Sequence, residues 1–402
     1  MFYKHCALWF CLWLATGHSS YASEMESAPQ PMVTVIPAPA AGKSGQPNLF
    51  TDQDGRVYLS WIERGEAGKS TLYFSVLKHG AWSSPQVIFT GTGQMVNPVD
   101  FPSLVRLQDG ALAAHWLKNH SGGGYDIQVS FSSDLGKNWS DPITPHTDNS
   151  PTEHGFVSLL PATNGDLDLV WLDGRDYAEE TRENQTALRY AQFDKSGQKT
   201  SEVVLDQRVC DCCQTAAANT RSGKVVVYRD RSANEIRDIA IVRYRDGEWM
   251  SPKVIHADGW EFHGCPVNGP SVDAKDRDLV ISWYTGAGST PQINLLFSRD
   301  EGDTFGRPVR VDGGDPLGRV GVVLLDNRSA LVSWIEAGEL RVRRVFSNGQ
   351  ADSPVTLAKL SSAMQSGVPQ LVRNTSGVYF AVTQRGKPSS LLTGMINYKV
   401  KP

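Results

Sequence analysis

Short apolar segments recur along the chain at a nearly constant spacing. They occupy residues 56–61, 111–116, 166–171, 224–228, 278–283, 330–334 and 378–382, and each ends in a bulky anchor: Trp61, Trp116, Trp171, Tyr228, Trp283, Trp334 and Val382. Successive anchors stand 55, 55, 57, 55, 51 and 48 residues apart. Runs of this length, rich in β-branched, aliphatic and aromatic residues and preceded by Gly or Asp/Asn turns, are typical of β-strands. The pattern predicts a chain built from repeats of one β-unit.

The residues around each anchor segment predict three further strands per repeat. A short strand precedes the turn before the anchor segment, as at 102–105, and a third strand follows it, as at 127–130. A fourth strand, usually marked by Ser-Pro or Asp-Pro, closes the unit. Four antiparallel strands in a period of about 50 residues make one blade of a β-propeller. We therefore predict an all-β propeller of four-stranded blades, with seven blades favoured and six as the alternative.

The two ends of the chain predict how the ring closes and where the protein resides. The last repeat lacks a fourth strand, and a strand-like run at 32–36, inside a tether at 24–45, is free to supply it ahead of the propeller at 46–402. Residues 1–23 have the basic start, short apolar run and small residues of a signal peptide. We expect a periplasmic or secreted protein with no membrane span. The net charge of -4 argues against nucleic acid as a partner.

Two turns at the same phase of the repeat share a motif. They read SSDLGKNW at 132–139 and SRDEGDTF at 298–305. The Asp side chain can satisfy turn amides, the Gly supplies a positive φ, and the aromatic residue can fill the space between blades. Both turns match Ser-x-Asp-x-Gly-x-x-Trp/Phe, the Asp box, so the chain resembles the sialidase (BNR-repeat) superfamily. The resemblance implies a propeller fold.

The resemblance also implies an active-site pattern. Sialidases hold the substrate carboxylate with three arginines and use a Tyr nucleophile paired with Glu, together with an acidic Asp. The segment in the place of the first arginine reads SGQPNL at 44–49 and contains none. A non-hydrolytic role is therefore favoured. The alternative is an exo-acting glycoside hydrolase, in which Tyr284 would be the nucleophile and Asp173 or Asp100 the acid.

Four cysteines follow the signal peptide, in two segments. Cys210, Cys212 and Cys213 lie in RVCDCCQT at 208–215, and Cys265 lies in FHGCPVNGP at 262–270. Cys210 and Cys265 each stand 18 residues before an anchor, so they hold equivalent positions in blades 4 and 5. We expect the two segments to meet at the mouth of the channel.

These cysteines have three chemical interpretations. A disulfide such as Cys210–Cys265 would link the two blades, as is usual in secreted proteins. Alternatively, two to four of the thiolates, together with the imidazole of His263, would bind copper or zinc. Redox-active thiols are the third interpretation.

Arginines follow the anchors of the neighbouring blades. The predicted ligand-binding residues are Arg175, Arg229, Arg231, Arg237 and Asn268. Guanidinium groups suit carboxylate or phosphate, which favours a small anionic ligand or glycan, whereas a network of ion pairs between blades is the structural alternative. The sequence thus predicts a secreted sialidase-like propeller that binds a metal ion or small anionic ligand at its mouth. A protein-interaction platform is a further alternative.

Overall fold

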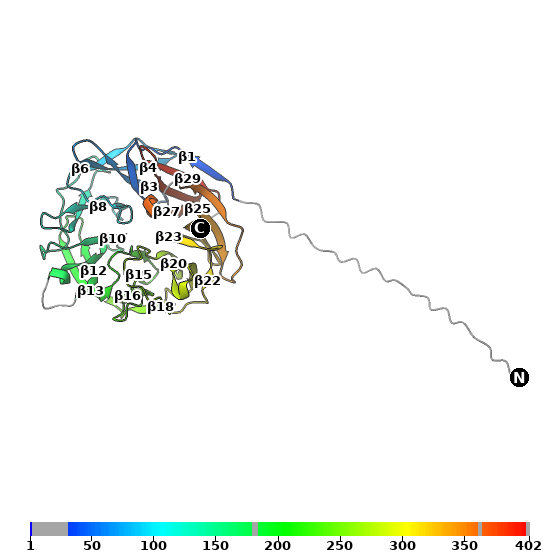
Figure 1. Ribbon diagram of the computed structural model, residues 1–402. Helices are drawn as coiled ribbons and strands as arrows, with labels where there is room; N and C mark the ends of the chain where they lie inside the picture. The colour runs from blue at the N-terminus through cyan, green and yellow to red at the C-terminus, as the bar shows by residue number, and fades with distance from the viewer. Residues whose placement is uncertain (2–30, 179–183, 361–363, 399–402) are drawn as a thin grey trace.

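The computed structural model describes Met1 and residues 31–178, 184–360 and 364–398. These residues form seven antiparallel sheets, arranged as blades around a channel (Figure 1). The prediction of a seven-bladed propeller is confirmed. Apart from Met1, the signal peptide expected at 1–23 lies outside the described residues, as does the tether up to residue 30.

The blades follow one another in chain order, and the first strand of each blade lines the channel. Blade 1 contains β2 (Ser44–Thr51), β3 (Val57–Arg64), β4 (Lys69–Lys78), β5 (Ala81–Trp82) and β6 (Gln86–Thr92). Blade 2 contains β7 (Ser103–Arg106), β8 (Leu112–Asn119) and β9 (Tyr125–Ser132). Blade 3 contains β10 (His154–Pro161), β11 (Leu167–Asp173), β12 (Thr186–Phe193) and β13 (Lys199–Val209).

The remaining blades repeat this order. Blade 4 contains β14 (Ala216–Asn219), β15 (Gly223–Arg229), β16 (Ile239–Arg245), β17 (Glu248–Trp249) and β18 (Lys253–His256). Blade 5 contains β19 (Ser271–Lys275), β20 (Asp278–Thr285), β21 (Gln292–Ser298) and β22 (Val309–Arg310). Blade 6 contains β23 (Pro316–Asp326), β24 (Ser329–Glu336), β25 (Glu339–Phe346) and β26 (Val355–Lys359). Short 3-10 turns η1 (Arg175–Ala178), η2 (Ala287–Ser289) and η3 (Met364–Ser366) lie in connections. No helix in the described ranges is long and apolar enough to cross a membrane.

The seventh blade joins the two ends of the chain. It contains β27 (Gln370–Asn374), β28 (Gly377–Gln384), β29 (Ser390–Ile396) and, as its outermost strand, β1 (Val33–Ile36). β1 pairs antiparallel with β29, so that Val33 lies opposite Ile396 and Ile36 lies opposite Thr393. The two strands lie side by side in Figure 1, one blue and one red. The predicted closure by an N-terminal strand is confirmed.

The anchor residues form the interior of the blades. Four of the anchor tryptophans are 0% exposed: Trp61, Trp171, Trp283 and Trp334. Three of the indole N–H groups donate to an acidic side chain two residues further on: Trp61 to Glu63 at 2.9 Å, Trp171 to Asp173 at 2.8 Å and Trp334 to Glu336 at 2.6 Å. A buried indole needs an acceptor, so this recurring pair explains an acid at the end of several anchor strands.

The Asp boxes form the turns that their sequences predict. In the first, Asp134 accepts the amide of Asn138 at 2.9 Å, and the φ of Gly136 is 86°. Trp139 packs edge-on against Phe74 of blade 1, with ring centroids 6.2 Å apart. The second box repeats the turn with Asp300 and Gly302. The motif therefore fixes a turn and fills the seam between neighbouring blades.

Blade 2 departs from the predicted four strands. After β9 the chain makes isolated bridges instead of a fourth strand: Ile143 and Val129 exchange amide and carbonyl bonds at 2.8 Å, and Glu153 bridges Tyr125. Pro142 and Pro145 flank Ile143 and have no N–H to donate to a strand ladder, so the pairing cannot extend. The chain from 133 to 153 therefore runs as a long connection to blade 3.

Candidate functional site

The cysteine segment lies in the connection from blade 3 to blade 4. It begins directly after β13 and leads to β14 beside the channel. Gln214 in this connection donates from Nε2 to the Val99 carbonyl at 2.8 Å, and its Oε1 accepts the amide of Gly269 at 3.0 Å. Gly269 belongs to the connection that carries Cys265. The two segments thus meet at one end of the channel, as predicted.

A disulfide joins the two segments, but not through the predicted pair. Cys212 is bonded to Cys265, with Cα atoms 6.0 Å apart. The predicted Cys210–Cys265 pair is wrong because residues 210–215 form a loop rather than a strand. Cys210 is held at the end of β13, where its amide donates to the Arg229 carbonyl at 3.0 Å, and the following turn carries Cys212 to Cys265.

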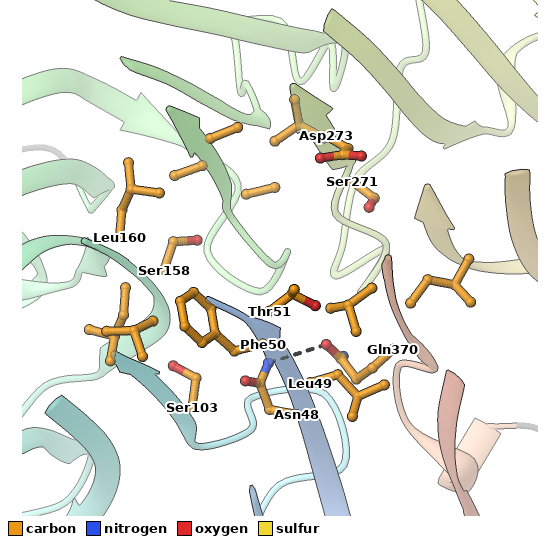
Figure 2. A pocket seen from close by; sticks show the side chains of 18 of the residues that line it. Asn48, Leu49, Phe50, Thr51, Ser103, Ser158, Leu160, Ser271, Asp273 and Gln370 are labelled. Carbon is orange, nitrogen blue, oxygen red and sulfur yellow. Dashed lines mark hydrogen bonds between the residues drawn. The ribbon is translucent and has the colours of Figure 1, made fainter. Parts of the chain in front are cut away.

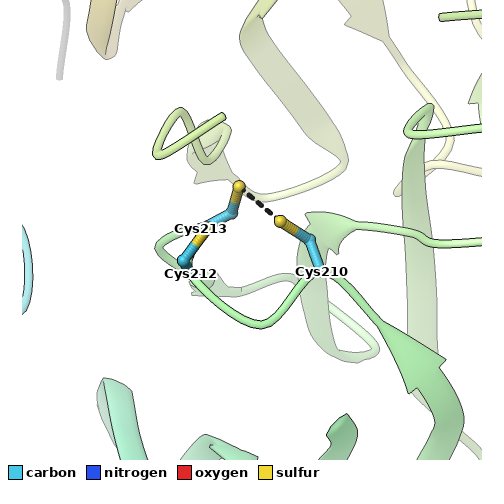
Figure 3. A group of neighbouring side chains, drawn as sticks. All are labelled: Cys210, Cys212 and Cys213. Atoms are coloured by element: carbon cyan, nitrogen blue, oxygen red, sulfur yellow. Dashed lines mark hydrogen bonds between the residues drawn. The ribbon is translucent and has the colours of Figure 1, made fainter. Parts of the chain in front are cut away.

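The other two cysteines form a buried thiol pair. Cys210 and Cys213 are 1% and 2% exposed, and their Sγ atoms point toward each other at 2.7 Å (Figure 3). Burial alone would raise the pKa of the Cys213 thiol. The hydrogen bond from Cys210 and the nearby Arg229 outweigh burial and lower that pKa to about 7. Burial and the Cys213 sulfur raise the pKa of the Cys210 thiol. The pair therefore holds one thiolate near neutral pH.

Arg229 is a buried cation beside these thiols. It is 1% exposed and donates only to backbone carbonyls: that of Asn268 at 2.8 Å, that of Tyr284 at 2.7 Å, and that of Arg237. Among the described residues, no carboxylate lies within 4.0 Å of its guanidinium group. Its positive charge therefore lacks a carboxylate partner.

Arg319 repeats this arrangement from blade 6. Its side chain donates to the Val267 carbonyl and is 4% exposed. Burial lowers its pKa to about 10, and Cys213 is the charge that opposes this shift. Two buried guanidinium groups, those of Arg229 and Arg319, thus interact electrostatically with the Cys213 sulfur.

The other predicted arginines are paired with acids. Arg175 donates twice to Asp173, at 2.7 Å from both Nε and Nη2. Arg231 and Arg237 share Glu235, at 3.0 Å from Nε of Arg231 and 2.6 Å from Nη2 of Arg237. These contacts match the ion-pair network rather than an open clamp for an anion.

Two further predicted ligands lie away from the thiols or are already bonded. His263 has a 73% exposed side chain, and its Nε2 lies 3.2 Å from Glu261, so the structure does not bring it to the thiol pair. Asn268 donates to the Leu317 carbonyl at 3.1 Å and accepts the amide of Arg319 at 2.9 Å. Asn268 thereby ties blade 5 to blade 6.

The hydrolase candidates do not form a sialidase-like group. Tyr284 is half-buried, burial and Asp315 raise the pKa of its phenol, and among the described residues its hydroxyl bonds to no glutamate. Burial would raise the pKa of Asp173, but its bonds from Arg175 outweigh burial and lower it, so Asp173 stays ionised. Asp100 is 3% exposed, and burial raises its pKa to about 7. Of these three candidates, only Asp100 thus has a pKa that suits a general acid near neutral pH.

The channel itself is a cavity of about 700 Å³ lined by the first strand of every blade. Small polar side chains, including Ser103, Ser158 and Ser271, project into it (Figure 2). Asn48 donates to Gln370 at 3.2 Å across the seam between blades 1 and 7. The lining is mixed, because apolar side chains such as Phe50 and Leu160 stand beside these polar ones.

Sequence reasoning missed two features that the residues do signal. Cys210 and Cys213 stand in a Cys-x-x-Cys relation, which the adjacent Cys212 obscured. The segment TPHTDNSPTEH at 144–154 carries His146, Asp148 and His154 close together in the long connection to blade 3.

Comparison with known proteins shows the fold and no family. No protein-family model matches the sequence, and neither does any curated protein. The BP39L lectin from Burkholderia pseudomallei has a similar structure, with TM-score 0.59 and 13% identity over 92% of this chain and 99% of the lectin. A protein of unknown function from Dyadobacter fermentans gives TM-score 0.50 and 17% identity over 92% of this chain and 98% of its own. The NanB sialidase from Streptococcus pneumoniae gives TM-score 0.47 and 10% identity over 92% of both chains. The chain is therefore a seven-bladed propeller similar in fold to this lectin.

Proposed function

We propose that this protein is a secreted or periplasmic metal-binding propeller, and that Cys210 and Cys213 bind one thiophilic ion at the mouth. The observation that carries the proposal is the pair of buried guanidinium groups, Arg229 and Arg319, which lack carboxylate partners beside two facing thiols. An uncompensated buried charge is costly. Two thiolates that share a monovalent cation carry one net negative charge and would offset part of that cost.

Copper(I) fits this donor set better than zinc. Soft thiolate ligands select Cu(I), whereas structural zinc usually takes four Cys or His ligands. Cys212 is committed to its disulfide with Cys265, and His263 points into solvent. An ion about 2.3 Å from each sulfur requires the sulfurs to separate beyond 2.7 Å. At least one of the two side chains must therefore turn about its Cα–Cβ bond when the ion binds.

The test is a Cu(I) titration of the reduced protein against a chromophoric Cu(I) chelator under anaerobic conditions. The wild-type protein should withdraw about one Cu(I) per chain from the chelator. The Cys210→Ser, Cys213→Ser variant should withdraw none. The matched control is Cys212→Ala, Cys265→Ala, which removes the neighbouring disulfide and should keep the Cu(I) site.

Two results would overturn the proposal. One is a wild-type protein that leaves all Cu(I) on the chelator while alkylation shows both thiols free. The other is a pair of sulfurs already oxidised to each other in the protein as isolated under anaerobic conditions, since a Cys210–Cys213 disulfide has no thiolate to offer.

A further inference from the structure

A second cluster of ligand-type side chains lies in the buried seam between blades 2 and 3. His146 belongs to the long β9–β10 connection, and His154 begins β10. Their rings stack with centroids 3.7 Å apart and planes 6° apart. The side chains are 2% and 0% exposed. The cluster is separate from the thiol pair and does not depend on the function proposed for it.

Nε2 of His146 and Nδ1 of His154 are buried and lack a hydrogen-bond partner. Buried polar atoms without a partner are rare, because each forfeits its bonds to water. Oδ1 of Asp126 is also unpartnered, and it lies 3.7 Å from Nε2 of His146 and 3.9 Å from Nδ1 of His154. Ligand-type atoms from blade 2, the connection and blade 3 therefore lie close together, since one such atom from each of Asp126, His146 and His154 lies within 4.8 Å of the others.

The opposite ring nitrogens face a different carboxylate. Asp148 places Oδ1 3.2 Å from Nδ1 of His146 and Oδ2 3.2 Å from Nε2 of His154. A histidine that ligates a metal through one nitrogen commonly gives the other N–H to a carboxylate, which fixes its tautomer. Asp148 is placed to do this for both rings.

The charges of the cluster favour a cation. Asp126, Asp148 and Asp173 all lie within 4.0 Å of a ring nitrogen. Arg175 approaches Asp148 at 3.4 Å and bonds to Asp173, and it is the main guanidinium group facing these three acids. Arg189 lies 3.5 Å from Asp173 but also bonds to Glu202. With neutral imidazoles the buried cluster therefore carries excess negative charge, which either protons or a metal dication must offset.

We propose that Asp126, His146 and His154 bind one divalent transition-metal ion, with zinc as the first candidate. Ligands about 2.0–2.2 Å from a zinc ion stand roughly 3–4 Å from one another, which matches the separations of 3.7 and 3.9 Å. Calcium is a poor fit because it takes oxygen ligands. The ion would link β9, the β9–β10 connection and β10, and so fasten blade 2, which lacks a fourth strand, to blade 3.

The connection is already shaped to hold these ligands. Its end packs against blade 2 where the Tyr125 amide donates to the Thr152 carbonyl at 3.1 Å, and against blade 3 where the Gly174 amide donates to the Glu153 carbonyl at 2.9 Å. A Cβ at Gly124 would stand 2.1 Å from the Thr152 carbonyl oxygen, so only glycine permits this approach. The ligand-bearing connection would thus already be held in place when the ion binds, which limits the conformational entropy lost on binding.

The experiment uses the Cys210→Ser, Cys213→Ser protein, in which the thiol pair cannot contribute. After treatment with chelator and desalting, this protein is given Zn(II), desalted again and its bound zinc measured. We expect about one zinc per chain and a raised Tm. Added His146→Ala or His154→Ala should abolish uptake. Added His115→Ala should not, because His115 is a buried histidine that bonds Ser103 outside the cluster. Calcium in place of zinc should not bind.

Cobalt(II) supplies an independent readout. The cobalt-loaded protein should show ligand-field bands of nitrogen and oxygen ligands without a sulfur-to-cobalt charge-transfer band. If the thiol-free protein binds no zinc, or if the His154→Ala change leaves uptake intact, the proposal fails. Should that variant not fold, Asp126→Asn, whose side chain is 20% exposed, takes its place, and undiminished zinc uptake by it would equally overturn the proposal.

Discussion

At the scale of single residues, the mouth is organised by cations that lack carboxylate partners. Arg231 and Arg237 share Glu235, whereas the buried Arg229 and Arg319 have only carbonyl oxygens as hydrogen-bond acceptors. Nε of Arg319 has no hydrogen-bond partner, and the guanidinium group of Arg229 also lies 4.8 Å from the centroid of the Trp260 ring. Among the described residues, no carboxylate offsets either charge. The position of the Cys213 sulfur next to these groups is the reason that we place the site at the thiols rather than at the arginines.

Asp100 supports a prediction about pH at the same scale. Burial raises its pKa to about 7 in the folded protein, whereas an unfolded Asp titrates near pH 4. Between these values the folded chain holds a proton that the unfolded chain has lost, so the free energy of unfolding falls as pH rises from about 4 to 7. Asp100→Asn stays neutral and keeps an oxygen for the Phe156 amide, which donates to Asp100 at 2.9 Å. The free energy of unfolding of the Asp100→Asn variant should therefore decrease less over this pH range than that of wild type.

The measurement is urea unfolding across that pH range. Asp246→Asn is the control, since Asp246 lies exposed in the β16–β17 turn and its loss should leave the slope unchanged. If Asp100→Asn and wild type lose stability in parallel as the pH rises, Asp100 is ionised throughout. Its role as a proton-holding acid, on which the hydrolase alternative depends, would then be removed.

At the scale of elements, the strands form the scaffold and the connections between blades carry the chemistry. The thiols, the disulfide and His146 all lie between the last strand of one blade and the first strand of the next. The strands could be predicted because each repeat restates the same apolar pattern and anchor. The conformations of the connections could not, because their partners lie far away in sequence. Arg229 finds its acceptors in Asn268 and Tyr284, 39 and 55 residues further on.

The disulfide supports a prediction about the connections. Cys212–Cys265 closes a loop of 53 residues that spans blade 4. Cross-linking a loop of this order removes freedom from the unfolded chain and stabilises a fold by about 2–4 kcal/mol. The Cys212→Ala, Cys265→Ala variant should therefore unfold at a lower urea concentration than wild type. Reductant should shift the unfolding midpoint of the wild type toward that of the variant. Equal unfolding midpoints for oxidised wild type and the variant would show that the bond does not stabilise the junction of blades 4 and 5.

At the scale of the whole molecule, the ring is closed by strands from both ends of the chain. The pairing of β1 with β29 covers the strand edge that the last repeat would otherwise expose. This closure could be predicted from one unpaired run at 32–36 and one incomplete repeat. The missing fourth strand of blade 2 could not, because Asp141-Pro142 resembles the Ser-Pro and Asp-Pro pairs that mark the fourth strands of other blades.

The central claim is that the closed ring presents a thiophilic metal site at the junction of blades 4 and 5. The most direct measurement is the copper content, by elemental analysis, of protein exported by copper-supplemented cells and purified without chelator or oxygen. The account predicts about one copper per wild-type chain, absent from Cys210→Ser, Cys213→Ser protein prepared in parallel. Wild-type protein without copper, or equal copper in both proteins, would contradict it.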